Sequence, residues 1–180
     1  VGGEQLIVKG KILKQFEWKS LIEIGCGSGA NLLRIVKTFP GVQVGGVDIN
    51  PDAIESAKKI FTGGLLKVGV GDNLMFSDSA TDVVLTDRML IYVSPRHINR
   101  YLKEMKRIGR NKIVLCEFYE PSLWKRLKLR FDSGLYAHDY PKLLHRQGFY
   151  DVVLYRIPAT LWPDDTYPSF VLTAKIPKRK

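Results

Sequence analysis

Residues 20–31 read Ser-Leu-Ile-Glu-Ile-Gly-Cys-Gly-Ser-Gly-Ala-Asn and set the framework for the whole chain. A short apolar run ends where three glycines follow at alternate positions, Gly25, Gly27 and Gly29. Glycine tolerates positive φ and has no Cβ, so a ligand can lie directly against the backbone of such a turn. An amphipathic segment, residues 31–39, follows at once. The pattern predicts a strand, a tight turn and a helix whose free N–H groups face the ligand.

Strand and helix patterns alternate along the rest of the chain. The expected strands are 20–25, 42–48, 65–70, 82–86, 112–118, 150–156 and 169–175. The expected helices are 4–16, 31–39, 51–61, 94–108, 122–131 and 140–146. Short connections between alternating elements predict one domain, residues 1–180, of the α/β class, with a doubly wound, mostly parallel, Rossmann-like sheet. The final two strands lack an intervening helix, which predicts that the last strand is antiparallel to the others.

The composition limits the class of protein. The chain has 180 residues and a net charge of +10, and residues 96–130 contain eleven Lys or Arg against three acids. This surplus favours an anionic partner such as a nucleic acid, a phosphorylated substrate or a membrane surface, unless it is a solvated face. No apolar run is long enough for a transmembrane segment. The two cysteines lack metal-binding spacing, which predicts no metal site and favours a reducing, cytoplasmic location.

Three acids stand at or near the ends of successive expected strands. Glu23 lies in the first strand, Asp48 closes the second and Asp72 follows the third. In an open parallel sheet the ligand lies at the carboxyl ends of the strands, where these acids meet. A carboxylate after the second strand can accept both hydroxyls of a ribose, and one after the third can accept an adenine amino group. The series therefore indicates an adenosine compound.

Two adenosine ligands compete for this site. Residues 25–30 also satisfy the dinucleotide fingerprint, so the glycines alone leave a nicotinamide cofactor open. Three observations disfavour that cofactor. An acid beside the turn has the wrong charge for a pyrophosphate, Asp72 has no place in the dinucleotide pattern, and the chain has no second domain for a hydride acceptor. A phosphate-binding P-loop is excluded because no Gly-Lys-Ser/Thr follows the glycines.

Four motifs in this order resemble those of the class I S-adenosylmethionine-dependent methyltransferases over nearly the whole chain, namely residues 21–31, 47–51, 69–72 and 82–87. The resemblance implies a seven-stranded sheet with an antiparallel last strand and S-adenosylmethionine as the cofactor. It implies a ribose contact at Asp48, an adenine contact at Ile49 and Asp72, glycines along the methionine part, and residues 86–89 beside the sulfonium. The predicted cofactor-binding residues are Glu23, Gly25, Cys26, Gly27, Gly29, Asn31, Asp48, Ile49, Asn50, Gly71, Asp72, Asn73, Thr86, Asp87 and Arg88.

A narrower likeness concerns the acceptor. Residues 92–95, 116–121 and 162–166 are similar to methylases associated with pseudaminic acid biosynthesis, which implies an acceptor related to bacterial surface sugars. The chain departs from that group at Tyr92, where histidine is usual, and over residues 124–139.

Methyl transfer from a sulfonium is an in-line displacement in which the protein mainly supplies alignment. An alcohol or ammonium acceptor also requires a general base. The predicted catalytic residues are His138 and Glu117, and the predicted substrate contacts are Tyr92, Arg96, Tyr119 and Asp139. The expected reaction is methyl transfer to an oxygen or nitrogen of a small-molecule or glycan-type acceptor, with or without a phosphate. The alternatives are a nucleic-acid methyltransferase that uses the basic residues 96–130, a nicotinamide-dependent enzyme and a catalytically silent binding module.

Overall fold

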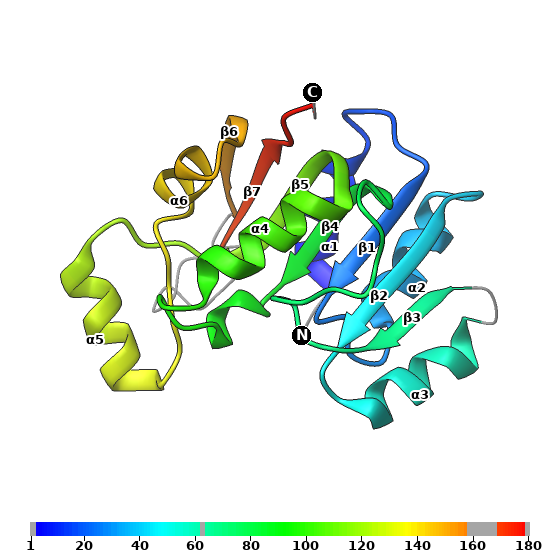
Figure 1. The fold of residues 1–180 in the computed structure, drawn as a ribbon, viewed down its shortest axis with the longest axis horizontal. Coiled ribbons are helices and arrows are strands. Elements are labelled where there is room, and N and C mark those ends of the chain that lie inside the picture. The colour runs from blue at the N-terminus through cyan, green and yellow to red at the C-terminus, as the bar shows by residue number, and fades with distance from the viewer. Residues whose placement is uncertain (1–2, 62–63, 158–168, 179–180) are drawn as a thin grey trace.

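The computed structural model describes residues 3–61, 64–157 and 169–178 and contains a seven-stranded sheet (Figure 1). The strands are β1 Ser20–Ile24, β2 Gln43–Asp48, β3 Leu65–Val68, β4 Thr81–Asp87, β5 Gly109–Phe118, β6 Tyr150–Arg156 and β7 Ser169–Lys175. Their order is β3-β2-β1-β4-β5-β7-β6, and β7 runs antiparallel to both of its neighbours while the remaining pairs are parallel. The predicted Rossmann-like fold is confirmed.

Helices cover both faces of this sheet. They are α1 Gly3–Leu13, α2 Ala30–Thr38, α3 Pro51–Ile60, the 3₁₀ helix η1 Leu90–Tyr92, α4 Ile98–Ile108, α5 Leu123–Ser133 and α6 Tyr140–Arg146. One apolar cluster joins α1, α2 and α3 to one face, and a second cluster joins α4 and α6 to the other. The view in Figure 1 shows α4 in front of the sheet and α5 projecting away from it. None of the described helices is long and apolar enough to cross a bilayer.

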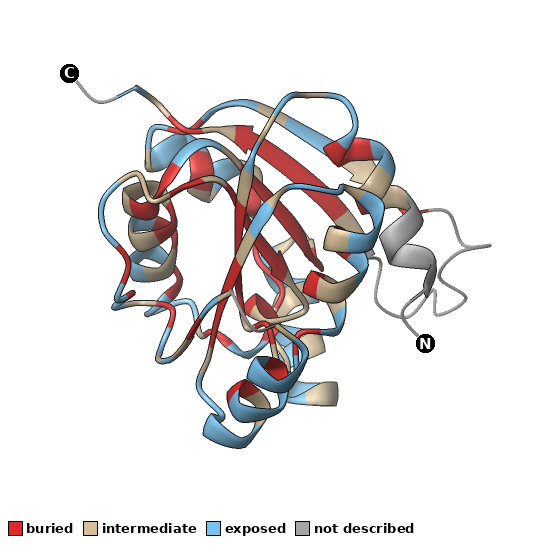
Figure 2. Cartoon of the chain, turned by 90° about the vertical axis from the view of Figure 1, so that its right-hand side faces the viewer, coloured by how far each residue is buried: buried red, intermediate tan, exposed pale blue. Residues whose placement is uncertain are grey.

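Buried strands explain the continuous apolar runs in the sequence. Leu21 belongs to the cluster under α1 and α2, whereas its neighbour Ile22 belongs to the cluster under α4. Both faces of β1 are therefore covered, as is usual for a parallel strand. Figure 2 shows the same pattern as red, buried strands between partly exposed helices.

The differences from the expected elements lie at their ends. The strand β3 stops at Val68, not at residue 70, and α4 begins at Ile98, not at residue 94, because residues 95–97 form a turn. The final strand β7 inserts between β5 and β6, so the last two strands form an antiparallel pair with β6 at the edge of the sheet. Residues 162–166, which carry part of the narrower likeness, lie outside the described residues.

The first prediction concerns Gly29, which precedes α2 with φ 81°. A Cβ at this position lies 2.8 Å from the ring of Phe61, whereas Gly41 has a similar φ of 85° and open space around it. A left-handed alanine costs about 1–2 kcal/mol at either site, and overpacking adds about 1–3 kcal/mol at Gly29 alone. Urea unfolding is expected to show a larger loss for Gly29→Ala than for Gly41→Ala. Equal losses would contradict the steric argument.

Candidate active site

The glycine turn is tied to the neighbouring strand β2. The backbone N–H groups of Gly25 and Cys26 both donate to the carbonyl oxygen of Val47, at 2.7 and 3.1 Å. The carboxylate of Asp48 then accepts a hydrogen bond of 2.8 Å from the N–H of Gly27. The turn therefore curls over the end of β2 and keeps a carboxylate beside its backbone.

A cavity of about 690 Å³ opens next to this turn, at the carboxyl ends of the strands. One end is lined by Gly25, Asp48 and Ile49, which is 72% exposed. A Cβ on Gly25, whose φ is 77°, would lie only 2.4 Å from Cγ of Met89, so only glycine lets the Met89 side chain pack against the turn here. The lining of the cavity also includes Arg88, Tyr92, His97, Arg130 and Tyr136.

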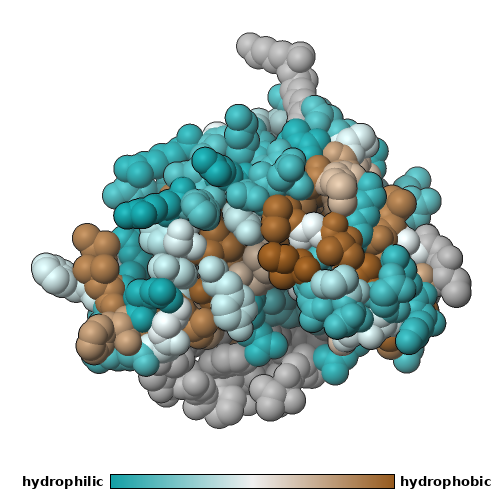
Figure 3. All heavy atoms as spheres, turned by 60° about the horizontal axis from the view of Figure 1, so that its bottom comes forward, coloured by the Kyte–Doolittle hydropathy of each residue, from teal (hydrophilic) through white to brown (hydrophobic). Residues whose placement is uncertain are grey.

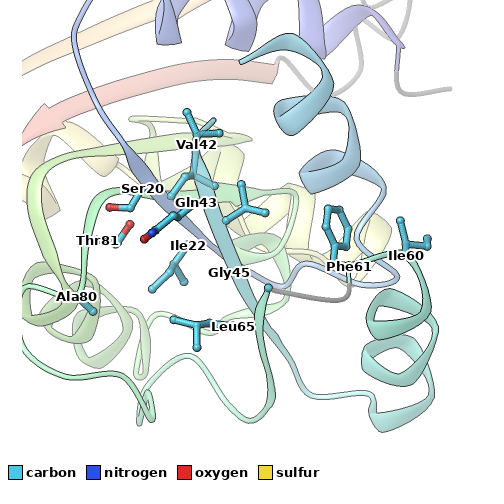
Figure 4. Close-up of a pocket in the computed structure, with 13 residues that line it drawn as sticks. Ser20, Ile22, Val42, Gln43, Gly45, Ile60, Phe61, Leu65, Ala80 and Thr81 are labelled. Carbon is cyan, nitrogen blue, oxygen red and sulfur yellow. The ribbon is translucent and has the colours of Figure 1, made fainter. Parts of the chain in front are cut away.

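A second hollow of about 600 Å³ lies at the amino ends of the strands, as Figure 4 shows. Its polar side chains are Ser20, Gln43 and Thr81, and no charged residue is among those that line it. Ligands of open α/β sheets bind at the carboxyl ends of the strands. The chemistry therefore belongs to the first cavity, which is called the cofactor cavity below.

Beneath the glycine turn lies a buried charged network. Lys9 of α1 is 3% exposed, and its ammonium pairs with the carboxylate of Asp87 at the end of β4. The side-chain amide of Asn31 donates to Glu23 at 2.7 Å and to Asp87 at 2.9 Å. Burial raises the pKa of Glu23 to about 7, and Oε2 of Glu23 has no hydrogen-bond partner among the described residues. Burial alone would lower the pKa of Lys9, but the neighbouring acidic groups raise it overall.

Glu117, a predicted catalytic residue, is 1% exposed at the end of β5. Its Oε1 accepts hydrogen bonds of 3.2 Å from the N–H groups of Met89 and Leu90, so it caps η1. Burial raises the pKa of Glu117 to about 8. Glu117 lies outside the lining of the cofactor cavity, and its contacts hold the segment that carries Arg88 and Tyr92.

His138, the other predicted catalytic residue, is also buried away from that lining. Its Nε2 lies 2.9 Å from the carbonyl oxygen of Val93. Because a carbonyl only accepts, this nitrogen carries the proton. The imidazole packs between the rings of Tyr136 and Tyr140, and burial lowers its pKa. These contacts favour a structural role.

The remaining predicted residues divide into two groups. Those that line the cofactor cavity are Gly25, Asp48, Ile49, Gly71, Asp87, Arg88 and Tyr92. Those that do not are Glu23, Cys26, Gly27, Gly29, Asn31, Asn50, Asp72, Asn73, Thr86, Arg96, Glu117, Tyr119, His138 and Asp139.

Members of the second group mostly make local contacts. Asp139 caps α6, Asn50 caps α3, and Tyr119 packs edge-on against Phe170. Asp72 lies near Tyr101, which does line the cavity: burial and the negative charge of Asp72 raise the pKa of that phenol.

Several residues of the site were not predicted from the sequence. His97, Arg130 and Tyr136 line the cavity, and Lys9 neutralises the network behind it. Only His97 carries a usable sequence signal, because it follows the Ser-Pro helix start directly after the fourth strand. Lys9 gives no local signal, since its partner Asp87 lies 78 residues away in the chain.

Comparison with known proteins agrees with this geometry. A family model described as "Methyltransferase domain" matches residues 21–112, which is just over half of the chain. The chain belongs to this methyltransferase family. S-adenosylmethionine is the cofactor of this class of enzyme, and the predicted class I assignment is confirmed.

Solved structures of similar fold belong to the same class. A SAM-dependent methyltransferase from Methanosarcina mazei has 21% identity and a TM-score of 0.72, over 91% of this chain and 96% of that one. Another similar structure is geranyl diphosphate C-methyltransferase from Streptomyces coelicolor A3(2), which was solved with Mg²⁺, geranyl diphosphate and S-adenosyl-L-homocysteine. It has 12% identity and a TM-score of 0.76, and the match covers 95% of this chain and 77% of that one. These identities establish the fold alone, and these matches do not support the narrower likeness to pseudaminic acid methylases.

The residues of this methyltransferase fit the cofactor. At Gly27, beside Asp48, a Cβ would meet nothing within 4 Å, which leaves room for a ligand against the backbone. The partnerless carboxylate oxygen of Glu23 suits a cationic or ammonium group, and S-adenosylmethionine carries both a sulfonium and an ammonium. No three side chains of His, Cys, Asp or Glu in the described residues lie together as a metal site.

The second prediction concerns Lys9. Replacing Lys9 with Met removes the buried cation of Asp87 and Glu23 and leaves Asp87 only the looser pair with Arg88, at 3.6 Å, which is expected to cost about 3–5 kcal/mol of unfolding free energy. The exposed pair of Lys58 and Glu55 is the matched control, because Lys58→Met is expected to cost less than about 1 kcal/mol. The double variant Lys9→Met/Asp87→Asn should recover part of the loss in urea denaturation. Equal effects of the two single lysine substitutions would rule out a stabilising buried pair.

The third prediction concerns pH and Glu117. A carboxyl whose pKa rises from 4.5 to about 8 on folding stays protonated in the native state while the unfolded chain ionises. Stability therefore falls as pH rises between about 4.5 and 8, by up to about 1.4 kcal/mol per pH unit for one group. Glu23 acts in the same direction up to about pH 7. The Glu117→Gln variant is expected to become more stable relative to the wild type as the pH rises. The measurement is the free energy of unfolding in urea from pH 5 to 9. Parallel stability curves would show that Glu117 is already ionised.

Proposed function

We propose that this methyltransferase transfers a methyl group to an oxygen or nitrogen of a small acceptor that bears a phosphate or carboxylate, such as an acidic sugar derivative. One observation carries the proposal: a single cavity is lined by the acids Asp48 and Asp87 and by the guanidinium groups of Arg88 and Arg130. Its volume of about 690 Å³ lies within the range of about 300–1,000 Å³ for small-molecule sites. Both signs of charge therefore line the cavity, as a cationic donor and an anionic acceptor require.

At the cofactor end each residue has a specific role in the proposal. Bound S-adenosylmethionine supplies an activated methyl group. Asp48 accepts the ribose hydroxyls, Ile49 offers its exposed apolar side chain to the adenine, and Asp72 with Asn73 lies toward the adenine amino group. Glu23 favours the ammonium group from behind the turn. The location of Asp48 and Ile49 in the cavity lining supports this arrangement.

At the acceptor end two guanidinium groups are held in place. Arg130 donates to the carbonyl of Gly134, and its guanidinium carbon lies 4.4 Å from the centre of the Tyr136 ring. Arg88 has φ 52°, and its Nε lies 3.6 Å from Oδ1 of Asp87. A non-glycine residue at positive φ stores strain of a kind that clusters at functional sites. Guanidinium groups bind phosphate and carboxylate through two parallel hydrogen bonds, which suits an anionic acceptor.

For proton removal we propose His97 in place of the two residues expected from the sequence. His97 lines the cavity, and histidine is the side chain that most often accepts a proton near neutral pH. Glu117 acts as a positioning residue, because it holds the N–H groups of Met89 and Leu90. His138 has its Nε2 engaged by a backbone carbonyl and supports the wall from behind.

The nucleic-acid alternative has less support. Several cations of residues 96–130 are held by internal contacts. Arg107 bonds Glu104, Asp78 and two backbone carbonyls, Arg110 pairs with Asp82, and Lys106 donates to a carbonyl. The acceptor site also lies inside a cavity of small-molecule size. A glycan or pseudaminic-acid-type acceptor stays a prediction that the same assay can test.

The fourth prediction has a binding arm and a transfer arm. Calorimetric titration with S-adenosylhomocysteine is expected to show binding that weakens about 10- to 100-fold in Asp48→Ala, the loss of a charged hydrogen-bond partner. Asp52→Ala, an exposed acid in the first turn of α3, is the matched control and should bind as wild type does. Absence of binding by the wild type would overturn the cofactor site.

The transfer arm follows S-adenosylhomocysteine release with a panel of sugar phosphates, sugar acids, neutral sugars and an RNA oligonucleotide. Anionic small molecules are expected to react fastest, and Arg130→Ala should raise their KM at least tenfold with a smaller change in kcat. His97→Asn should instead lower kcat. Equal rates with neutral sugars, or a preference for RNA, would overturn the proposed acceptor class while leaving the cofactor site intact.

A further inference from the structure

The helix α5 has an unusual position in the molecule. It is capped by Ser122 at its start and by Gly134, at φ 72°, at its end, yet none of its residues is buried. Its Leu129 packs on a small cluster formed by Ile91, Phe118 and Ala137, and its Leu123 and Leu127 line a hollow of about 270 Å³ shared with α6. Figure 1 shows the helix projecting beyond the sheet.

Four large apolar side chains of α5 are exposed. The exposed fractions are 59% for Leu123, 81% for Trp124, 52% for Leu127 and 92% for Phe131. Their spacing places them on one stripe of the helix, and Leu129 falls on a different side. In Figure 3, hydrophobic atoms gather at the left edge of the molecule, where α5 lies, with hydrophilic atoms beside them. A stripe of this kind is unfavourable in water and suits an apolar contact.

Cations border this stripe on both sides. By helical spacing Arg126 and Arg130 follow one edge, and Lys125 and Lys128 follow the other. Against these four cations the helix has one acid, Asp132, whose carboxylate pairs with Lys128 at 2.5 Å. An apolar stripe with tryptophan and phenylalanine, bordered by lysine and arginine, is typical of a helix that lies in the headgroup region of a bilayer. Basic residues beside the stripe complement anionic headgroups.

Other occupants fit less well. A partner protein that covers the stripe needs no border of cations on both sides. A nucleic acid uses cations and aromatic rings, but it gains little from the aliphatic Leu123 and Leu127. An anionic bilayer uses the tryptophan, the phenylalanine, both leucines and the cations together.

We propose that α5 docks the protein on the surface of an anionic bilayer, with Trp124 and Phe131 inserted among the headgroups. Arg130 of α5, together with Gly134 and Tyr136 of the segment that follows the helix, lines the cofactor cavity. Docking through α5 therefore brings the acceptor end of the cavity close to the membrane surface. The inference concerns the surface of the protein and does not depend on the identity of the acceptor.

The fifth prediction is tested with vesicles and the full chain. The protein is expected to float with vesicles of equimolar phosphatidylcholine and phosphatidylglycerol at low salt, and to float poorly with phosphatidylcholine alone. The double variant Trp124→Ser/Phe131→Ser should weaken binding at least tenfold. The matched control, Ile60→Ser/Met75→Ser, removes two exposed apolar side chains elsewhere and should bind as wild type does. Circular dichroism and binding of S-adenosylhomocysteine confirm that each variant is folded.

The contribution of the lysine charge and the insertion of Trp124 are measured separately. Lys125→Glu should weaken binding to anionic vesicles about tenfold, whereas Lys59→Glu in α3, the same change in net charge, should have little effect. Tryptophan emission should shift to shorter wavelength on binding, and Trp124→Phe should remove the shift. Four results overturn the proposal: no vesicle binding, equal binding to neutral vesicles, wild-type binding by Trp124→Ser/Phe131→Ser, or α5-dependent binding of polyuridylate RNA in place of vesicles.

Discussion

The carbonyl oxygen of Val47 accepts from two consecutive backbone N–H groups, those of Gly25 and Cys26, and the geometry of the site depends on this shared acceptor. It satisfies both donors where β1 ends, so the turn can be buried against β2 without a water molecule. The next residue, Asp48, is thereby brought to the N–H of Gly27. The cavity follows directly: α2 leaves toward one face of the sheet and α4 covers the other, and a crevice stays open between them.

Behind that crevice the protein keeps several acids in a region of low dielectric, where each charge needs compensation. Glu117 receives two backbone N–H groups, and Asp87 receives Lys9 and Asn31. Glu23 and Glu117 each keep one carboxyl oxygen without a hydrogen-bond partner in the described residues, and the other oxygen of Glu23 is bonded to Asn31. A buried acid that is half satisfied, beneath a glycine turn, fits a site that is completed by a cationic ligand.

Local signals explain what could be predicted from the sequence and what could not. The glycine turn, the alternating strands and helices, and the acids at the strand ends depend on neighbours within a few residues, and all of them appear in the structure. The place of β7 between β5 and β6 depends on pairing between distant segments, which no local pattern encodes. The same holds for Lys9, whose partner is remote in sequence. His138 was predicted as a catalytic base because its residue type suits that task, but the type says nothing about burial, and the carbonyl of Val93 engages its ring.

The two ends of the cavity are anchored very differently, and this has a consequence for specificity. The cofactor end is built from the ends of buried strands, with Ile24 and Val47 both nearly inaccessible. The part of the cavity that we propose for the acceptor takes Arg130 and Tyr136 from a segment whose helix buries none of its residues. Weakly packed segments open locally at low free energy and tolerate sequence change. A fold of this design keeps its cofactor geometry constant while the acceptor end is free to vary, which is why the cofactor could be inferred from local motifs and the acceptor had to be argued from the charges and shape of the assembled cavity.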